Sequence, residues 1–212
     1  MSTSPRTITT QNKEILMRIQ DKLKQLKSKR GFTLVELMIV VAIIGVLAAL
    51  AIYGVRKYLT NAKSAEARSA VGRMAKDAST AFERELMGGG TITPGESRQI
   101  GRSLCPGSVA SVPGLLSSVA AGKYQSSVTE WSADPGWACL RFSMQEPQYF
   151  RYTYSVPAGL TAAGDSFNAI ANGDLDGDGN PSSFSLAGTL TTDGSEIVVL
   201  MEPSIQEANG EE

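Results

Sequence analysis

A long apolar run dominates the hydrophobic pattern of this chain of 212 residues. Residues 32–55 contain only two ionisable side chains, Glu36 and Tyr53. As a helix this run is about 36 Å long, because each residue adds about 1.5 Å, so it can cross the hydrocarbon core of a bilayer. The pattern therefore predicts a transmembrane helix.

The helical pattern continues beyond the apolar run in amphipathic form. Apolar side chains recur with a period of 3.6 residues over residues 56–87, and this stripe is interrupted at Glu66. Three glycines follow at 88–90, and a glycine run ends helices. We therefore predict a single helix over residues 32–87, whose second half is the core helix under a sheet.

The remaining sequence has the alternation and the regularly spaced turn residues of antiparallel strands. Residues 88–123 are predicted to be a connecting loop, residues 124–201 an antiparallel sheet, and residues 202–212 an acidic tail that frays. The strands are expected at 124–131, 137–144, 148–156, 183–190 and 195–201. A long helix followed by several antiparallel strands predicts an α+β fold, with the helix covering one face of the sheet.

Basic side chains precede the apolar run. Residues 1–31 contain eight Lys and Arg residues against only Glu14 and Asp21. This excess predicts that the N-terminus lies on the cytoplasmic side of the membrane. Apolar residues at helical spacing among the lysines indicate an amphipathic, membrane-surface helix. Translation from Met17 would give a shorter basic segment, and a start at Met1 or at Met17 stays open.

The composition excludes most catalytic chemistry. The chain has no histidine and two cysteines, which excludes imidazole-based hydrolysis, His-ligated zinc and a self-contained iron–sulfur site. The near-zero net charge of −1 excludes a generally basic protein that coats nucleic acid. We therefore predict that the protein is not an enzyme and requires no cofactor.

The junction between the basic segment and the apolar run carries a longer motif. Residues 29–49 read KRGFTLVELMIVVAIIGVLAA. This segment resembles the class III signal of type IV prepilins, and the resemblance extends from residue 29 to about residue 60. It implies that a prepilin peptidase removes a leader of residues 1–31 by cleaving the Gly31–Phe32 bond, and that Phe32 is then N-methylated. It also implies the pilin fold.

Glu36 is an exceptional residue, because a carboxylate in an apolar helix usually has a functional partner. In one interpretation it neutralises the amine of its own processed chain at Phe32. In the other, which the resemblance implies, it attracts the amine of a neighbouring subunit and sets the axial register during assembly. The chain also lacks the proline that many relatives have after the apolar stretch, so whether the helix unwinds around Gly45 to Gly54 stays open.

The function that the resemblance implies is a structural subunit of a type IV pilus, favoured as the major pilin. Such a subunit is assembled from the inner membrane into a retractable surface filament for motility, adhesion or DNA uptake. Its partners are copies of itself, the prepilin peptidase, the inner-membrane assembly machinery and, before assembly, the lipid bilayer. The alternatives are a minor pilin, a type II secretion pseudopilin, or a membrane-anchored binding domain that does not polymerise.

The two cysteines follow the predicted transmembrane run and therefore lie outside the cytoplasm. An even number of cysteines in an oxidising compartment favours a disulfide between Cys105 and Cys139. It would tie the connecting loop to a strand and stabilise the fold by roughly 4 kcal/mol. Two free, buried cysteines are the alternative.

A last motif alternates acidic residues with glycine. Asp174, Asp176, Asp178 and Asn180 resemble the first half of a calcium-binding loop, in which oxygens at alternate positions converge on one cation. The distal glutamate of an EF-hand is missing. The motif predicts a calcium site with these four ligands, and a plain Asp/Gly turn between strands is the alternative.

Overall fold

The computed structural model describes residues 13–22, 31–84, 86–87, 100–157 and 159–210. The chain divides into two compact units, Met1–Tyr53 and Gly54–Glu212. Residues 13–22 are helical, which agrees with the helix predicted before the apolar run. The rest of that predicted helix lies outside the described residues.

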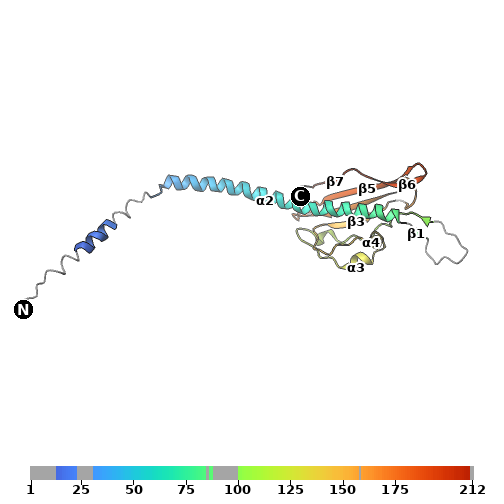
Figure 1. Ribbon diagram of the computed structural model, residues 1–212, viewed down its shortest axis with the longest axis horizontal. Coiled ribbons are helices and arrows are strands. Elements are labelled where there is room, and N and C mark those ends of the chain that lie inside the picture. The colour runs from blue at the N-terminus through green and yellow to red at the C-terminus, as the bar shows by residue number, and fades with distance from the viewer. Residues whose placement is uncertain (1–12, 23–30, 85, 88–99, 158, 211–212) are drawn as a thin grey trace, which may run out of the picture. The chain divides into compact units, whose positions relative to one another are not determined.

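The predicted long helix is present as α2, which runs from Leu34 to Glu83 (Figure 1). It continues without interruption through Gly45 and Gly54. Its end comes earlier than predicted, because Leu86–Met87 form β1 and pair with Ile100–Gly101 of β2. The glycines at 88–90 lie outside the described residues.

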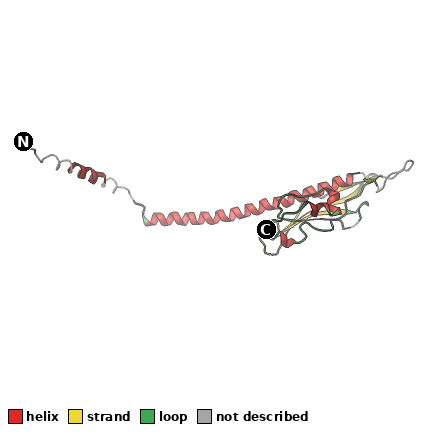
Figure 2. Cartoon of the chain, turned by 90° about the horizontal axis from the view of Figure 1, so that it is seen from below, coloured by secondary structure: helices red, strands yellow, loops and turns green. Residues whose placement is uncertain are grey.

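The two halves of α2 differ in burial. Every described residue from 31 to 59 is exposed, whereas the second half buries a stripe of mainly small side chains. The buried residues are Ser64, Ala67, Ala70, Val71, Met74, Ala75, Ala78, Ala81 and Phe82. Because so many of them are alanine, the helix backbone can approach the sheet closely. In the second unit, this half of α2 forms a layer over the strands (Figures 1 and 2).

The main sheet has five antiparallel strands. They are β3 (Arg151–Ser155), β4 (Ser166–Gly173), β5 (Ser182–Asp193), β6 (Glu196–Met201) and β7 (Gln206–Ala208). The order is β3-β4-β5-β6, and β7 also pairs with β5. The long strand β5 therefore pairs with β4 along one edge and with both β6 and β7 along the other.

The core lies between the sheet and the second half of α2. Side chains of β3 and β4 alternate between buried and half-buried, and Tyr152 and Tyr154 lie on the buried face of β3. Phe150 packs edge-to-face on Phe184 with ring centroids 5.6 Å apart. A Cβ atom at Gly173 would lie 2.5 Å from the Phe150 ring, so glycine is required there for this packing.

Two strand predictions are wrong. The segments predicted as strands 124–131 and 137–144 contain two short helices, α3 (Val128–Ser132) and α4 (Pro135–Leu140). Ser127 and Glu130 form a capping box at the start of α3, and Asp134 followed by Pro135 starts α4. These are helix-start signals that outweigh a few residues of apparent alternation.

Two strands of the main sheet were not predicted. β4 falls in a sequence rich in Ala, Asn and Gly, and β7 falls in the tail that was expected to fray. The β7 backbone pairs with β5, and the Arg68 guanidinium Nε lies 2.6 Å from a carboxylate oxygen of Glu207. This part of the tail is therefore held against the sheet and α2.

Candidate processing and assembly site

The predicted cleavage point lies just before α2. Gly31, Phe32 and Thr33 have neither helical nor strand structure, and Phe32 is 83% exposed. Among the described residues, nothing lies within 4 Å of a Cβ atom built at Gly31. The Gly31–Phe32 peptide bond therefore lies outside the helix and is not covered by the described parts of the chain.

Glu36 is held by the residue that precedes the helix. The backbone N–H and the hydroxyl of Thr33 both donate to Glu36 Oε2 at 2.8 Å, and the Glu36 N–H donates to Thr33 Oγ1 at 3.2 Å. This is a capping box, which satisfies N–H groups that have no partner inside the helix. We did not predict it, although the T-x-x-E spacing of Thr33 and Glu36 was a signal for it.

By its length and its composition, the first half of α2 meets the requirements for a membrane-spanning helix. None of its most apolar 18 residues is buried by the described parts of the chain. Its only acidic residue, Glu36, is in the first turn. This segment therefore has an apolar surface that the rest of the described chain does not cover.

Glu66 interrupts the apolar stripe of α2 for a structural reason. Its Oε1 accepts hydrogen bonds from the backbone N–H of Tyr149 at 2.9 Å and from the hydroxyl of Tyr152 at 3.0 Å. Partial burial raises the pKa of the Glu66 carboxyl, although these hydrogen bonds oppose the shift. Burial and the adjacent Glu66 carboxylate also raise the pKa of Tyr152. Glu66 is therefore a polar link between α2 and the residues around β3.

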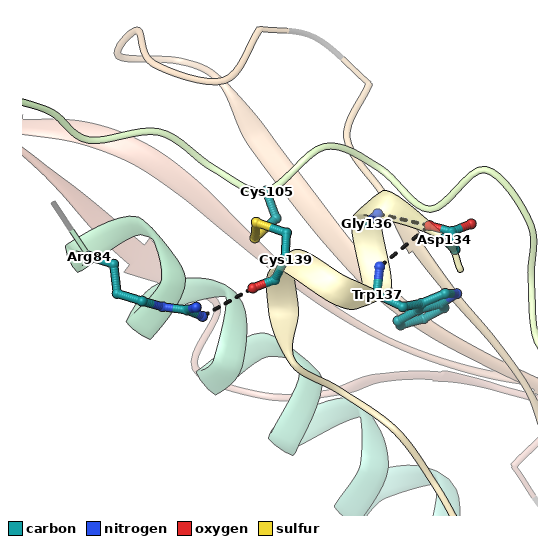
Figure 3. Close-up of a disulfide and its surroundings, with 6 residues drawn as sticks. All are labelled: Arg84, Cys105, Asp134, Gly136, Trp137 and Cys139. Carbon is teal, nitrogen blue, oxygen red and sulfur yellow. Dashed lines mark hydrogen bonds between the residues drawn. A yellow bond between two sulfur atoms is a disulfide. The ribbon is translucent and has the colours of Figure 1, made fainter. Parts of the chain in front are cut away.

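The predicted disulfide is confirmed. Cys105 and Cys139 are bonded, with their Cα atoms 5.7 Å apart (Figure 3). Cys139 lies in α4 rather than in a strand, so the bond ties the preceding loop to a helix. The guanidinium of Arg84, just after α2, donates to the Cys139 carbonyl at 3.2 Å.

Asp134 organises the loop beside the disulfide and was not predicted. One carboxylate oxygen accepts from the N–H groups of Gly136 and Trp137 at the start of α4 (Figure 3). The other accepts from Val109 and Ala110 at 2.8 and 2.9 Å. Loop and helix approach closely here, since a Cβ atom at Gly136 would lie 2.7 Å from a backbone nitrogen of the loop.

The acidic turn connects β4 to β5. Ligand atoms of Asp174, Asp176 and Asp178 lie within 4.8 Å of one another. Asp174 accepts from the N–H groups of Gly177 and Gly179 at 2.7 and 3.2 Å, as in a turn that needs no ion. Three converging carboxylates fit the oxygen ligands that calcium prefers.

The fourth expected ligand has a partner within the turn. Asn180 donates from its backbone N–H and its side-chain amide to Asp178, at 2.7 and 3.0 Å. These hydrogen bonds lower the pKa of the Asp178 carboxyl. Calcium binding by Asp174, Asp176, Asp178 and Asn180 stays a prediction.

Comparison with known proteins agrees with the N-terminal geometry. Residues 26–52 match the family model described as the prokaryotic N-terminal methylation motif. The chain is 60% identical over 40 residues to "Type IV major pilin protein PilA" of Myxococcus xanthus (strain DK1622), which covers 19% of this chain and 18% of that protein. It is 46% identical over 61 residues to "Type IV major fimbrial protein FimA" of Dichelobacter nodosus, covering 29% of this chain and 36% of that protein.

A third relative shows the same pattern. The chain is 50% identical over 42 residues to "Fimbrial protein" of Moraxella nonliquefaciens, covering 20% of this chain and 27% of that protein. The matches thus span between 18% and 36% of the length of these three relatives. No solved structure matches the chain.

The matched segment contains the junction, the capping box and most of the apolar half of α2. The α+β architecture behind it is pilin-like, with a long N-terminal helix packed on an antiparallel sheet. Such proteins are structural, which agrees with the prediction that the chain is not an enzyme. The chain therefore carries the prokaryotic N-terminal methylation motif, and its N-terminal segment and its fold are similar to those of type IV pilins.

Proposed function

We propose that this protein is the structural subunit of a type IV pilus. The precursor is cleaved at Gly31–Phe32, Phe32 is N-methylated, and the mature chain leaves the inner membrane for a retractable filament on the cell surface. The observation that carries this proposal is the first half of α2. Its residues 34–55 are wholly exposed and apolar, with Glu36 as their only charged residue, and they follow closely on the Gly31–Phe32 bond.

The mechanism is physical. Exposed apolar surface is stable in hydrocarbon or against an apolar partner, and unfavourable in water. A bundle of identical helices can replace the lipid, so little free energy separates the two states and assembly can be reversed. Glu36 then directs each subunit to its axial register, since its carboxylate can attract the amine of a neighbouring Phe32.

Shearing surface filaments from cells tests the proposal. We expect the dominant protein of the sheared fraction to be this chain without residues 1–31. A filament fraction in which the chain is a trace component would favour the minor pilin, and its recovery only from short periplasmic fibres would favour the pseudopilin. A chain that stays in the membrane as a monomer under piliating conditions would contradict polymerisation.

A further inference from the structure

Two lysines of the second unit meet at one aromatic ring. The ammonium groups of Lys63, on α2, and Lys123, in the loop before α3, lie 5.0 and 4.6 Å from the centroid of the Tyr149 ring. Tyr149 is itself fixed, because its backbone N–H donates to Glu66. The face of an aromatic ring attracts cations. Lys63, Lys123 and Tyr149 therefore form a lysine–tyrosine cluster with two positive charges at a defined place.

No carboxylate forms a close ion pair with this cluster within the described parts of the chain. Neither ammonium group lies within 4.0 Å of an acidic oxygen there, in contrast to the Arg68–Glu207 pair. Glu66 interacts electrostatically with Lys123, but its Oε1 accepts hydrogen bonds from Tyr149 and Tyr152. Lys123 is exposed and Lys63 half-buried. The two charges can therefore receive an external anion.

The cluster continues a line of cations that begins where the apolar run ends. Arg56 is exposed, directly follows Val55 and precedes Lys63 by seven residues. Seven residues are about two helical turns, so both side chains lie on one face of α2, about 10 Å apart along its axis. Tyr58 is 72% exposed, and tyrosine is a residue type that is enriched at membrane–water interfaces. Arg56, Lys63 and Lys123 together form a cationic stripe.

The dimensions of the stripe match the outer part of a bilayer. The headgroup layer adds about 5–8 Å on each side of the hydrocarbon core. Arg56 therefore falls in this layer, and Lys63 lies within about one Debye length beyond it. The chain beyond residue 31 has twelve basic and nineteen acidic side chains. Its net charge would repel an anionic surface, so an attraction must come from a local arrangement such as this stripe.

We infer that the cationic stripe binds the phosphate groups of anionic phospholipids in the leaflet from which α2 emerges. This inference rests on the proposed function, because it requires the apolar run to span the bilayer. Each Lys or Arg near an anionic surface contributes about a fivefold gain in association. The stripe thereby holds the second unit at the membrane until a subunit is extracted, when carboxylates of a second copy could replace the lipid.

Amine acetylation of the full mature chain in vesicles tests this inference. The chain is reconstituted into vesicles of phosphatidylcholine alone or with phosphatidylglycerol, treated with an acetylating N-hydroxysuccinimide ester, and digested for mass spectrometry. Lys76 is the matched control, because it is exposed on the same helix about 20 Å beyond Lys63. We expect Lys63 and Lys123 to react at least about fivefold more slowly with phosphatidylglycerol present, and Lys76 to be unaffected. High salt should abolish the difference.

Four other outcomes overturn the inference. Equal rates in both vesicle types, or equal slowing of Lys63, Lys123 and Lys76, would show that the stripe has no specific contact with anionic lipid. Slowing seen only in assembled filaments would assign the stripe to a second copy of the chain. A chain that fails to float with vesicles of either composition would overturn the proposed membrane span as well, so the two failures are distinguishable.

Discussion

At the scale of single residues, carboxylates at the boundaries between elements determine much of this fold. Asp134 joins a loop to α4, Glu66 joins α2 to β3, and Glu36 caps α2. Each accepts at least two hydrogen bonds from groups that would otherwise lack partners. Glu66 is the most informative of them, because its partners are a backbone N–H and a buried tyrosine hydroxyl.

The pH dependence of stability follows from Glu66. Burial raises the pKa of its carboxyl in the folded state, so the folded chain holds this proton more tightly than the unfolded chain. The contribution of Glu66 protonation to the free energy of unfolding is therefore fully present below the unfolded pKa, and it is lost as the pH rises through the folded pKa. Glu66→Gln offers a carbonyl to the same two donors but has no proton to lose. Over about pH 4 to 7, we therefore expect the variant to lack the part of the pH dependence of stability that Glu66 causes.

Thermal unfolding of the wild-type chain and the variant over this pH range measures the difference. Glu66→Gln should be at least as stable as the wild type at pH 7. Glu66→Ala is the control that leaves both donors without a partner, and it should lose about 1–3 kcal/mol. A stability difference between the wild type and Glu66→Gln that is constant with pH would contradict the assignment.

At the scale of elements, the disulfide ties the loop that precedes α3 to α4. Cys105 and Cys139 are 34 residues apart, and closing a loop of this length removes roughly 4 kcal/mol of unfolded-state entropy. We expect a reductant to lower the melting temperature of the wild-type chain strongly. The variant with both cysteines changed to serine should melt at the lower temperature whether or not reductant is present. A wild-type melting temperature unchanged by complete reduction would contradict this account.

The β4–β5 turn supports a prediction about calcium. Convergence of Asp174, Asp176 and Asp178 predicts that millimolar Ca²⁺ raises the melting temperature relative to chelator. A concentration ten times the dissociation constant would stabilise the fold by about 1.4 kcal/mol. The double variant Asp176→Asn with Asp178→Asn keeps Asp174, which caps the turn, and should not respond. Identical wild-type melting in calcium and chelator would leave the plain Asp/Gly turn as the correct interpretation.

At the scale of the whole molecule, the sequence was sufficient to predict those elements whose signals lie within the element itself. The apolar run and the helical period of α2 are repeated many times along the chain, so both are readable without tertiary information. β4 was not predicted, because its Ala, Asn and Gly residues have little strand preference and are held by pairing with β3 and β5. β7 depends equally on a distant partner.

The candidate site was predictable to the same extent. Gly31, Phe32 and Glu36 lie within one short motif, and the cysteine count alone indicated the disulfide. The role of Glu66 was not predictable, since its partners are 83 and 86 residues away in the sequence. The helices α3 and α4 were a different case, because the spacing of Ser127 to Glu130 and the Asp134–Pro135 pair are local helix signals that the strand prediction did not include.

The proposed role of Glu36 in setting the axial register concerns assembly of whole subunits and can be tested by a substitution. Glu36→Gln keeps an acceptor for the capping box, because glutamine serves in that motif, but it removes the charge that would attract a neighbouring amine. We expect normal cleavage after Gly31 together with a loss of surface filaments, measured by shearing cells and by the size of the membrane-bound chain. Normal filament yield in this variant would show that the charge is not needed for assembly.

The most direct test of the central claim is the mass and N-terminal sequence of the mature chain. Processing as a pilin predicts a chain that begins at Phe32, carries one N-methyl group and lacks the whole basic segment. A mature chain that still contains the residues before Phe32 would contradict the account.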